Sequence, residues 1–159
     1  MYVNARAIIE RETLAGTEIL LQVAERPGDP PTLEFPGGRL EEYEPILDAL
    51  RREVLEETGL VITQILDDIN RAVWTVPGVE VECLHPFCVY QTTAGPVDSI
   101  GFFFRCHAEG ILTGRGDAAS GHQWVPVAVA AHRLRASPGD FHWLTSAALA
   151  HYLRWRALQ

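Results

Sequence analysis

The stretch from Gly37 to Leu60 reads GGRLEEYEPILDALRREVLEETGL and combines a glycine turn, a helical segment and a series of acidic side chains. Proline suits the first turn of a helix because it has no N–H to leave unpaired. Glycine suits the position after the last turn because it accepts a positive φ. The sequence therefore predicts a helix from Pro45 to Thr58, entered through the Gly37–Gly38 turn and closed by Gly59.

The inward face of this helix changes from aliphatic to acidic toward its C-terminal end. At ~100° per residue, Ile46, Leu50 and Val54 share one stripe. Glu53 and Glu57 continue that stripe instead of lying opposite to it. Buried carboxylates repel one another unless a cation or water compensates them. Because Mg2+ and Mn2+ prefer oxygen ligands, the pattern predicts a site for one of these ions. A surface helix with solvated glutamates is the alternative.

The same stretch resembles the Nudix box, G-x5-E-x7-R-E-U-x-E-E-x-G-U, in which U is aliphatic. The sequence agrees at all nine defined positions, over 23 of 159 residues, so a chance match is remote. The matching residues are Gly38, Glu44, Arg52, Glu53, Val54, Glu56, Glu57, Gly59 and Leu60. The resemblance implies the Nudix fold, an α/β/α sandwich with a mixed central β-sheet, formed by one Nudix hydrolase domain over residues 1–159.

The resemblance also implies roles for individual residues. The metal-binding groups would be Glu53, Glu56, Glu57 and the backbone of Gly37 and Gly38. Arg52 would orient the acidic cluster by hydrogen bonding, and Glu44 would support the helix start without taking part in the chemistry. Members of the family hydrolyse a nucleoside diphosphate linked to another moiety, using a metal-activated water.

A further acidic residue is expected from a later loop, as in many family members. Asp117 is the only acid in the segment 114–123, so we expect it to act as an accessory metal ligand or base. Glu80 and Glu82 are rival candidates because the period of two places both on one face of a strand. A solvated position is the alternative for all three.

Substrate contacts outside the metal site are predicted from residue type. Arg39, within the turn of the box, is the first candidate for a phosphate contact, and His122 is another. Aromatic stacking is expected to recognise a base, with core packing as the alternative role of each ring. The candidate rings are Tyr90, Phe87, Trp74 and the run Phe102–Phe104.

The composition disfavours several classes of protein. A net charge of −8 argues against a stable nucleic-acid partner or an anionic membrane, and a polyphosphate would need a divalent cation to approach. The three cysteines form no C-x-x-C pair and predict neither a zinc site nor a disulfide framework, although a Cys83–Cys106 pair stays open. No signal peptide and no run of ~20 apolar residues is present, so we expect a cytoplasmic protein.

The rest of the chain predicts strands before and after the central helix and two helices near the end, an order that favours an α/β sandwich with a mixed sheet. We expect Arg11–Gly16 to be a turn, Gly110–His122 a glycine-rich loop, and Pro86 a break in its strand. The three adjacent phenylalanines predict a strand buried on both faces or lining a pocket. The expected strands are Tyr2–Glu10, Glu18–Ala24, Leu33–Pro36, Leu60–Ile65, Asn70–Val76, Val79–Thr92, Ser99–Ala108 and Trp124–Val127, and the helices are Val127–Leu134 and Thr145–Ala157.

The predicted function is a Mg2+-dependent (or Mn2+-dependent) pyrophosphohydrolase that cleaves the diphosphate bond of a nucleoside diphosphate derivative, of the nucleotide, nucleotide sugar or ADP-ribose type. The alternative is a catalytically idle sensor of the same fold that binds a nucleotide or ADP-ribose. Isoprenoid diphosphate isomerisation is less favoured, because no cysteine or histidine arrangement calls for it. A homodimer through the aromatic strands or the terminal helix is an open question.

Overall fold

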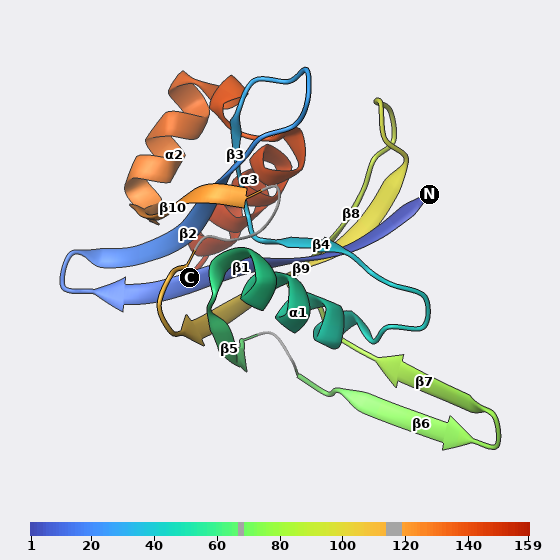
Figure 1. Ribbon diagram of the computed structural model, residues 1–159. Helices are drawn as coiled ribbons and strands as arrows, with labels where there is room; N and C mark the ends of the chain where they lie inside the picture. The colour runs from blue at the N-terminus through green and yellow to red at the C-terminus, as the bar shows by residue number, and fades with distance from the viewer. Residues whose placement is uncertain (67–68, 114–118) are drawn as a thin grey trace.

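The computed structural model describes residues 1–66, 69–113 and 119–159 (Figure 1). Its elements, in chain order, are β1 (Tyr2–Thr13), β2 (Gly16–Ala24), β3 (Thr32–Glu34), β4 (Gly37–Arg39), α1 (Ile46–Thr58), β5 (Val61–Ile65), β6 (Ala72–Val76), β7 (Val79–Cys83), β8 (Cys88–Gln91), β9 (Ser99–Glu109), β10 (Ala119–Pro126), α2 (Val127–Ala136), the short 3-10 helix η1 (Pro138–Asp140) and α3 (Trp143–Arg156).

Eight of the strands form one mixed sheet. The order is β10-β2-β1-β9-β5, with β3 paired to β2, β4 to β1 and β8 to β9. The central pair, β1 and β9, is parallel, whereas the other pairs are antiparallel. This arrangement confirms the predicted mixed central sheet.

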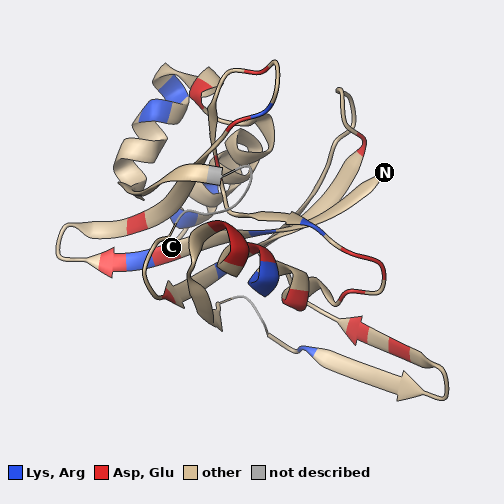
Figure 2. Ribbon diagram, viewed as in Figure 1, with Lys and Arg blue, Asp and Glu red and all other residues tan. Residues whose placement is uncertain are grey.

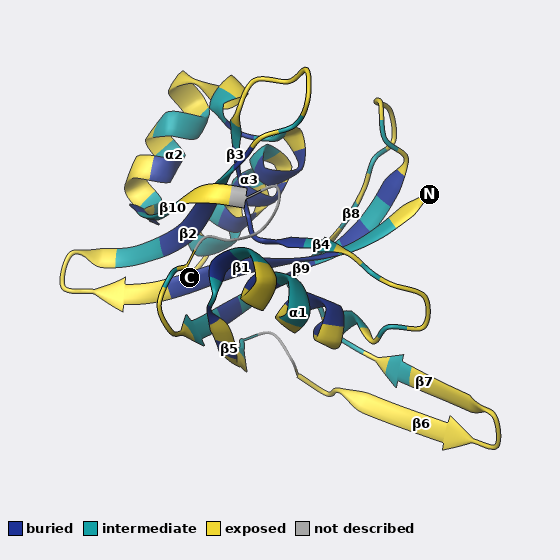
Figure 3. Ribbon diagram, in the orientation of Figure 1, coloured by how far each residue is buried: buried dark blue, intermediate teal, exposed yellow. Residues whose placement is uncertain are grey.

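The middle of β1 is buried (Figure 3). Its apolar side chains alternate between two cores, one on each face of the sheet. Ala5, Ala7 and Ile9 pack with the buried face of α1, whereas Ile8 packs with residues of α2 and α3. This period of two is the usual pattern of a strand covered on both faces. The chain is therefore an α/β/α sandwich, with α1 on one face and α2 and α3 on the other.

The phenylalanine run lies in β9 and contributes to both cores. Phe103 is fully buried on the α2 and α3 face, and Phe104 is buried on the α1 face. The expectation of a strand buried on both faces is confirmed. Leu149 and Tyr152 of α3 are likewise fully buried in the core.

Helix α1 begins one residue later than predicted, because Pro45 has the extended ψ of 139° and caps the helix from outside. Gly59 ends the helix as expected, with φ of 77° and its N–H donated to the carbonyl of Leu55. The buried side of α1 consists of Leu47, Ala49, Leu50, Val54 and Thr58.

Two strands extend further than the sequence indicated. The turn predicted over Arg11–Gly16 is shorter than expected, since β1 continues to Thr13 and only Leu14 and Ala15 separate it from β2. Cross-strand bonds from Arg11 to Glu18 and from Thr17 to Glu12 stabilise the extension. The last strand, β10, starts at Ala119 and not at Trp124, because its first residues pair with the end of β2.

The strands β6 and β7 form a separate two-stranded hairpin that projects beyond the N-terminal end of α1 (Figure 1). The predicted break at Pro86 is confirmed, since β7 ends at Cys83 and β8 begins at Cys88. Cys83 is exposed and Cys106 is buried, and no disulfide bond joins them. Within the described ranges, none of the helices has the length and apolar character needed to cross a bilayer.

Candidate functional site

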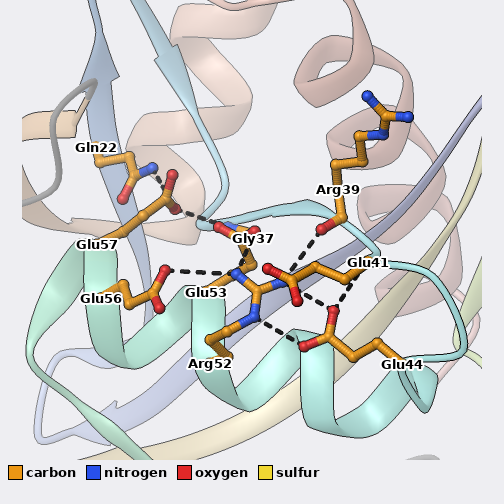
Figure 4. A network of polar contacts seen from close by, with 9 residues as sticks. All are labelled: Gln22, Gly37, Arg39, Glu41, Glu44, Arg52, Glu53, Glu56 and Glu57. Carbon is orange, nitrogen blue, oxygen red and sulfur yellow. Dashed lines mark hydrogen bonds and ion pairs between the residues drawn. The ribbon is translucent and has the colours of Figure 1, made fainter.

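The acidic end of α1 lies against the Gly37–Gly38 turn, which forms β4 at the edge of β1 (Figure 4). A Cβ on Gly38 would lie 2.5 Å from the carboxylate of Glu53, closer than real side chains approach. A Cβ on Gly37 would overlap the backbone of Ala5, and its φ of 134° also favours glycine. The two glycines therefore let the backbone approach the carboxylates directly.

Glu57 is turned inward and held by two donors. One of its oxygens accepts the N–H of Gly37 at 2.8 Å and the side-chain N–H of Gln22 at 2.8 Å. Burial raises the pKa of Glu57 to about 7, although these hydrogen bonds and the charge of Arg6 oppose the shift. Burial thus favours the neutral form of this carboxyl, and a cation beside it would favour the charged form.

Arg52 occupies the centre of the acidic cluster (Figure 4). Its guanidinium donates two hydrogen bonds to Glu44, at 2.8 and 2.9 Å, and one to Glu53, at 2.9 Å. A longer bond of 3.4 Å reaches Glu56, and a bond of 3.2 Å reaches the carbonyl of Arg39. The paired guanidinium lowers the pKa of Glu44 to about 2. One cation therefore joins the start of the helix, the glycine turn and the acidic end.

The three glutamates near the C-terminal end of α1 do not form a closed cage. In the part of the chain that the structure describes, no three His, Cys, Asp or Glu side chains converge closely enough to hold a metal ion. Glu53 faces the turn, Glu57 is turned inward, and the side chain of Glu56 is 59% exposed. Three carboxylates and nearby backbone carbonyls nevertheless have the oxygen chemistry that Mg2+ and Mn2+ require. The Glu53 carboxylate against the backbone of Gly38 and the buried carboxylate of Glu57 are both oxygen groups that a divalent cation would stabilise.

The other predicted acids lie elsewhere. Asp117 is outside the described residues. Glu80 and Glu82 lie on the β6–β7 hairpin and line a cavity of about 790 Å³ together with the start of α1. Among the described residues, the wall of that cavity includes none of the three metal-binding candidates, and Glu82 is paired with Arg71. The structure therefore places these two rivals near Glu44 and does not bring them to Glu53, Glu56 or Glu57.

Arg39 contributes to the site through its backbone carbonyl, which accepts a hydrogen bond from Arg52. The guanidinium stacks on the ring of Tyr2 at 4.5 Å and points away from the glutamates (Figure 4). Arg39 also lines a cavity of about 450 Å³ with Arg52 and Glu53. Figure 2 shows the strongly acidic surroundings along α1 and the loop before it.

The sequence interpretation did not identify Gln22 as part of the site. Gln22 is fully buried on β2, on the same face as Leu20, which packs with α1. Its amide nitrogen binds Glu57, while its amide oxygen is buried without a hydrogen-bond partner among the described residues. A glutamine inside the apolar run EILLQVA was the available signal, because buried polar side chains normally have a specific partner.

The sequence interpretation also missed a second set of residues beside the site. Glu34 belongs to this set and pairs with Gln22 between β2 and β3. Glu34 is buried and forms an ion pair of 2.8 Å with Arg26. Next to it, burial and the charge of Arg26 lower the pKa of His142 to about 4. The rings of His142 and Trp143 lie 4.8 Å apart. A cavity of about 340 Å³ is lined by Arg26, Asp29, Pro30, Thr32, Pro96, Phe141, His142 and Trp143.

The aromatic residues chosen from the sequence are mostly core residues. Tyr90 packs on Phe103, with ring centroids 5.7 Å apart, and accepts a hydrogen bond from Asn4. Phe87 packs against Tyr152, so core packing explains both choices. His122 has a partly buried ring whose pKa is lowered by that burial.

Comparison with known proteins agrees with this geometry. The family model described as NUDIX domain matches residues 2–146. The chain therefore belongs to the NUDIX domain family. This match confirms the resemblance that the box alone indicated.

One curated relative is the 8-oxo-dGTP diphosphatase of Buchnera aphidicola subsp. Acyrthosiphon pisum (strain APS). It is 50% identical over 32 residues, which is 20% of this chain and 26% of that protein, so the match spans about a quarter of the relative's length.

Solved structures share the fold at low sequence identity. The MutT NUDIX hydrolase from Burkholderia pseudomallei is 18% identical with a TM-score of 0.63, covering 94% of this chain and 95% of that one. The E. coli ORF135 protein is 21% identical with a TM-score of 0.63, covering 100% and 93%. The NUDIX domain of Shewanella oneidensis NrtR, complexed with ADP ribose, is 15% identical with a TM-score of 0.60, covering 83% and 77%.

Proposed function

We propose that this protein is a pyrophosphohydrolase that depends on Mg2+ or Mn2+ and cleaves the diphosphate bond of a nucleoside diphosphate linked to another moiety. One observation carries the proposal. Glu53 and Glu57 both face the Gly37–Gly38 turn, where glycine leaves space beside one carboxylate and burial raises the pKa of the other. Such a site requires positive charge, and a divalent metal ion supplies it.

The proposed ligands of the metal are Glu53, Glu56, Glu57 and the backbone carbonyls of Gly37 and Gly38. A bound Mg2+ would neutralise the diphosphate and lower the pKa of the attacking water. Arg52 orients Glu53 through the 2.9 Å hydrogen bond, and Gln22 with the Gly37 N–H fixes the carboxylate of Glu57. A carboxylate accepts the proton of the water, and Asp117 remains the proposed accessory residue for that step.

We further propose that the nucleoside enters the 340 Å³ cavity beside Trp143. Trp143 is 40% exposed there, and Arg26 is held at the cavity wall by Glu34. An aromatic ring and a guanidinium suit a base and a phosphate, respectively. The relatives supply two candidate substrate classes, an oxidised deoxynucleoside triphosphate and an ADP-ribose-like compound.

The test is release of phosphate, pyrophosphate or nucleoside monophosphate from a panel of nucleoside diphosphate derivatives, with Mg2+, with Mn2+ and with EDTA. We expect turnover of one substrate class that EDTA abolishes. Glu53→Gln and Glu57→Gln should each lower kcat by about 100-fold or more, because each removes charge from the proposed metal site.

Asp48→Asn is the matched control, since Asp48 lies on the same helix and is exposed. It should retain turnover close to that of the wild type. Near-normal kcat of Glu57→Gln at saturating Mg2+ would exclude the assigned site. Binding of a panel member by the folded wild type without any turnover would favour the sensor alternative.

A further inference from the structure

The β6–β7 hairpin has two chemically different faces. Its register pairs Trp74 with Val81, Val76 with Val79 and Ala72 with Cys83 on one face. The intervening pairs, Val73 with Glu82 and Thr75 with Glu80, lie on the other face. Because side chains alternate along a strand, every carboxylate of the two strands is on one side, and the opposite side is entirely apolar or uncharged.

The polar face is turned toward the body of the same molecule. Val73, Glu80 and Glu82 line the 790 Å³ cavity together with Glu44 and Asp48 at the start of α1. Arg71 at the base of the hairpin is paired with Glu82. Val79 of the apolar face also borders this cavity, but Trp74, Val76 and Val81 are not among its lining residues, so these three side chains lie away from α1.

The outward face is exposed to a degree unusual for such side chains. The exposed fractions are 74% for Trp74, 53% for Val79, 50% for Val81 and 43% for Val76. An isolated two-stranded hairpin is marginally stable, and it usually needs another surface against its apolar side. Contiguous apolar patches of several hundred Å² commonly mark an interaction surface.

We propose that two copies of this chain associate through the outward face of the β6–β7 hairpin. The chain carries a net charge of −8, so two copies repel each other over most of their surfaces. The outward face carries no ionisable carboxylate or basic group on either strand, which makes it a place where two acidic copies can meet without opposing charges. The same net negative charge disfavours an anionic membrane as the binding partner of this face.

The surfaces that the sequence suggested for a dimer do not offer an alternative. The aromatic strand β9 and the inner side of α3 are used in the core, where Phe103, Phe104, Leu149 and Tyr152 are at most 1% exposed. The hairpin face instead presents an uncovered tryptophan beside three valines.

The area of the outward hairpin face limits how strongly two copies can associate through it. One tryptophan and three half-exposed valines amount to about 400 Å² of apolar surface on each copy. A two-fold contact between two such faces would bury about 800 Å² in total, below the size of a stable interface and typical of a transient one. We therefore expect a reversible dimer whose population rises with protein concentration.

Two lysine substitutions on the hairpin provide a matched test. Val81 and Val73 are 50% and 52% exposed on adjacent strands, but they lie on opposite faces. Val81→Lys places a charge in the proposed interface, whereas Val73→Lys places it next to Glu82, on the polar face. Circular dichroism and thermal unfolding of both variants verify that each one folds.

Sedimentation equilibrium over the micromolar to high-micromolar range measures the association. The wild type should shift from its monomer mass of 17.7 kDa toward twice that mass as concentration rises. Val73→Lys should follow the wild type, and Val81→Lys should stay monomeric with at least a tenfold weaker association constant. A wild type that remains monomeric, or a dimer that Val81→Lys leaves intact, overturns the proposal. Vesicle binding that Val81→Lys abolishes in a monomeric wild type would assign the face to a membrane instead.

Discussion

Replacing Gly38 by alanine should damage the site without damaging the fold. The added Cβ would lie 2.5 Å from the carboxylate of Glu53, while ordinary contact begins near 3.4 Å. The carboxylate must therefore move by about 0.9 Å, several times the ~0.2 Å tolerance of a metal–ligand distance. A displacement of about 1 Å in a catalytic constellation costs about 100-fold in rate. We expect a similar loss in kcat/KM and a marked rise in the Mg2+ concentration needed for half-maximal activity.

The cost in stability should be small, because the group that moves is the flexible end of a side chain. Gly38 does not have a positive φ, so alanine fits its backbone conformation. We expect the free energy of unfolding to fall by less than about 1 kcal/mol. Gly37→Ala is the matched contrast, since its Cβ would overlap backbone atoms of Ala5 and Arg6 at a φ of 134°. That variant should lose about 2 kcal/mol or more.

The assay combines three measurements on both variants: kcat/KM against Mg2+ concentration, Mn2+ affinity by isothermal titration calorimetry, and Tm by scanning calorimetry in EDTA. The reasoning is refuted if Gly38→Ala keeps kcat/KM and Mn2+ affinity within twofold of the wild type. It is also refuted if Gly38→Ala lowers Tm as much as Gly37→Ala does.

Three further predictions concern groups around the site. Because burial raises the pKa of Glu57 from 4.5 to about 7, the folded metal-free protein binds more protons than the unfolded chain between these values. Its stability should therefore fall as pH rises from about 5 to 7.5, by on the order of 2 kcal/mol from this group. Thermal unfolding in EDTA should show this decline in the wild type but not in Glu57→Gln; equal pH dependence in the two proteins would contradict it. His142 has the opposite effect, because its lowered pKa makes stability rise with pH over part of that range. Since both proteins contain His142, its contribution cancels when the wild type is compared with Glu57→Gln. Gln22→Leu should lower kcat/KM about tenfold by releasing the Glu57 carboxylate, with little loss of stability because the substitution also removes an unpaired buried oxygen. Unchanged kcat/KM would remove Gln22 from the site. Trp143→Ala should raise KM about tenfold and leave kcat within twofold, since stacking against a base contributes to binding and not to chemistry. A KM equal to that of the wild type would place the nucleoside elsewhere.

Much of the fold followed from local sequence. Gly59 ended α1 as expected, because glycine readily adopts a positive φ, and Pro86 separated β7 from β8, because proline lacks the N–H that a strand pairing needs. The three adjacent phenylalanines predicted a strand that is buried on both faces or lines a pocket, and the structure shows the first of these, with Phe103 and Phe104 in opposite cores. The length of β1 was not predictable in this way, because its extension depends on pairing with β2.

The candidate site shows the same difference between features that local sequence predicted and features that depend on contacts between distant elements. The sequence alone determined that Glu53 and Glu57 continue the apolar stripe of α1, because the helical period fixes the directions of side chains on one helix. Only the tertiary structure decided their partners. Gln22, on another strand, reaches Glu57 because β2 crosses the face that α1 covers. Glu80 and Glu82 share a strand face, as predicted, yet the hairpin carries them to the other end of the helix. Periodicity describes neighbours within one element, whereas contacts between distant elements depend on sheet order and packing, which no local pattern encodes.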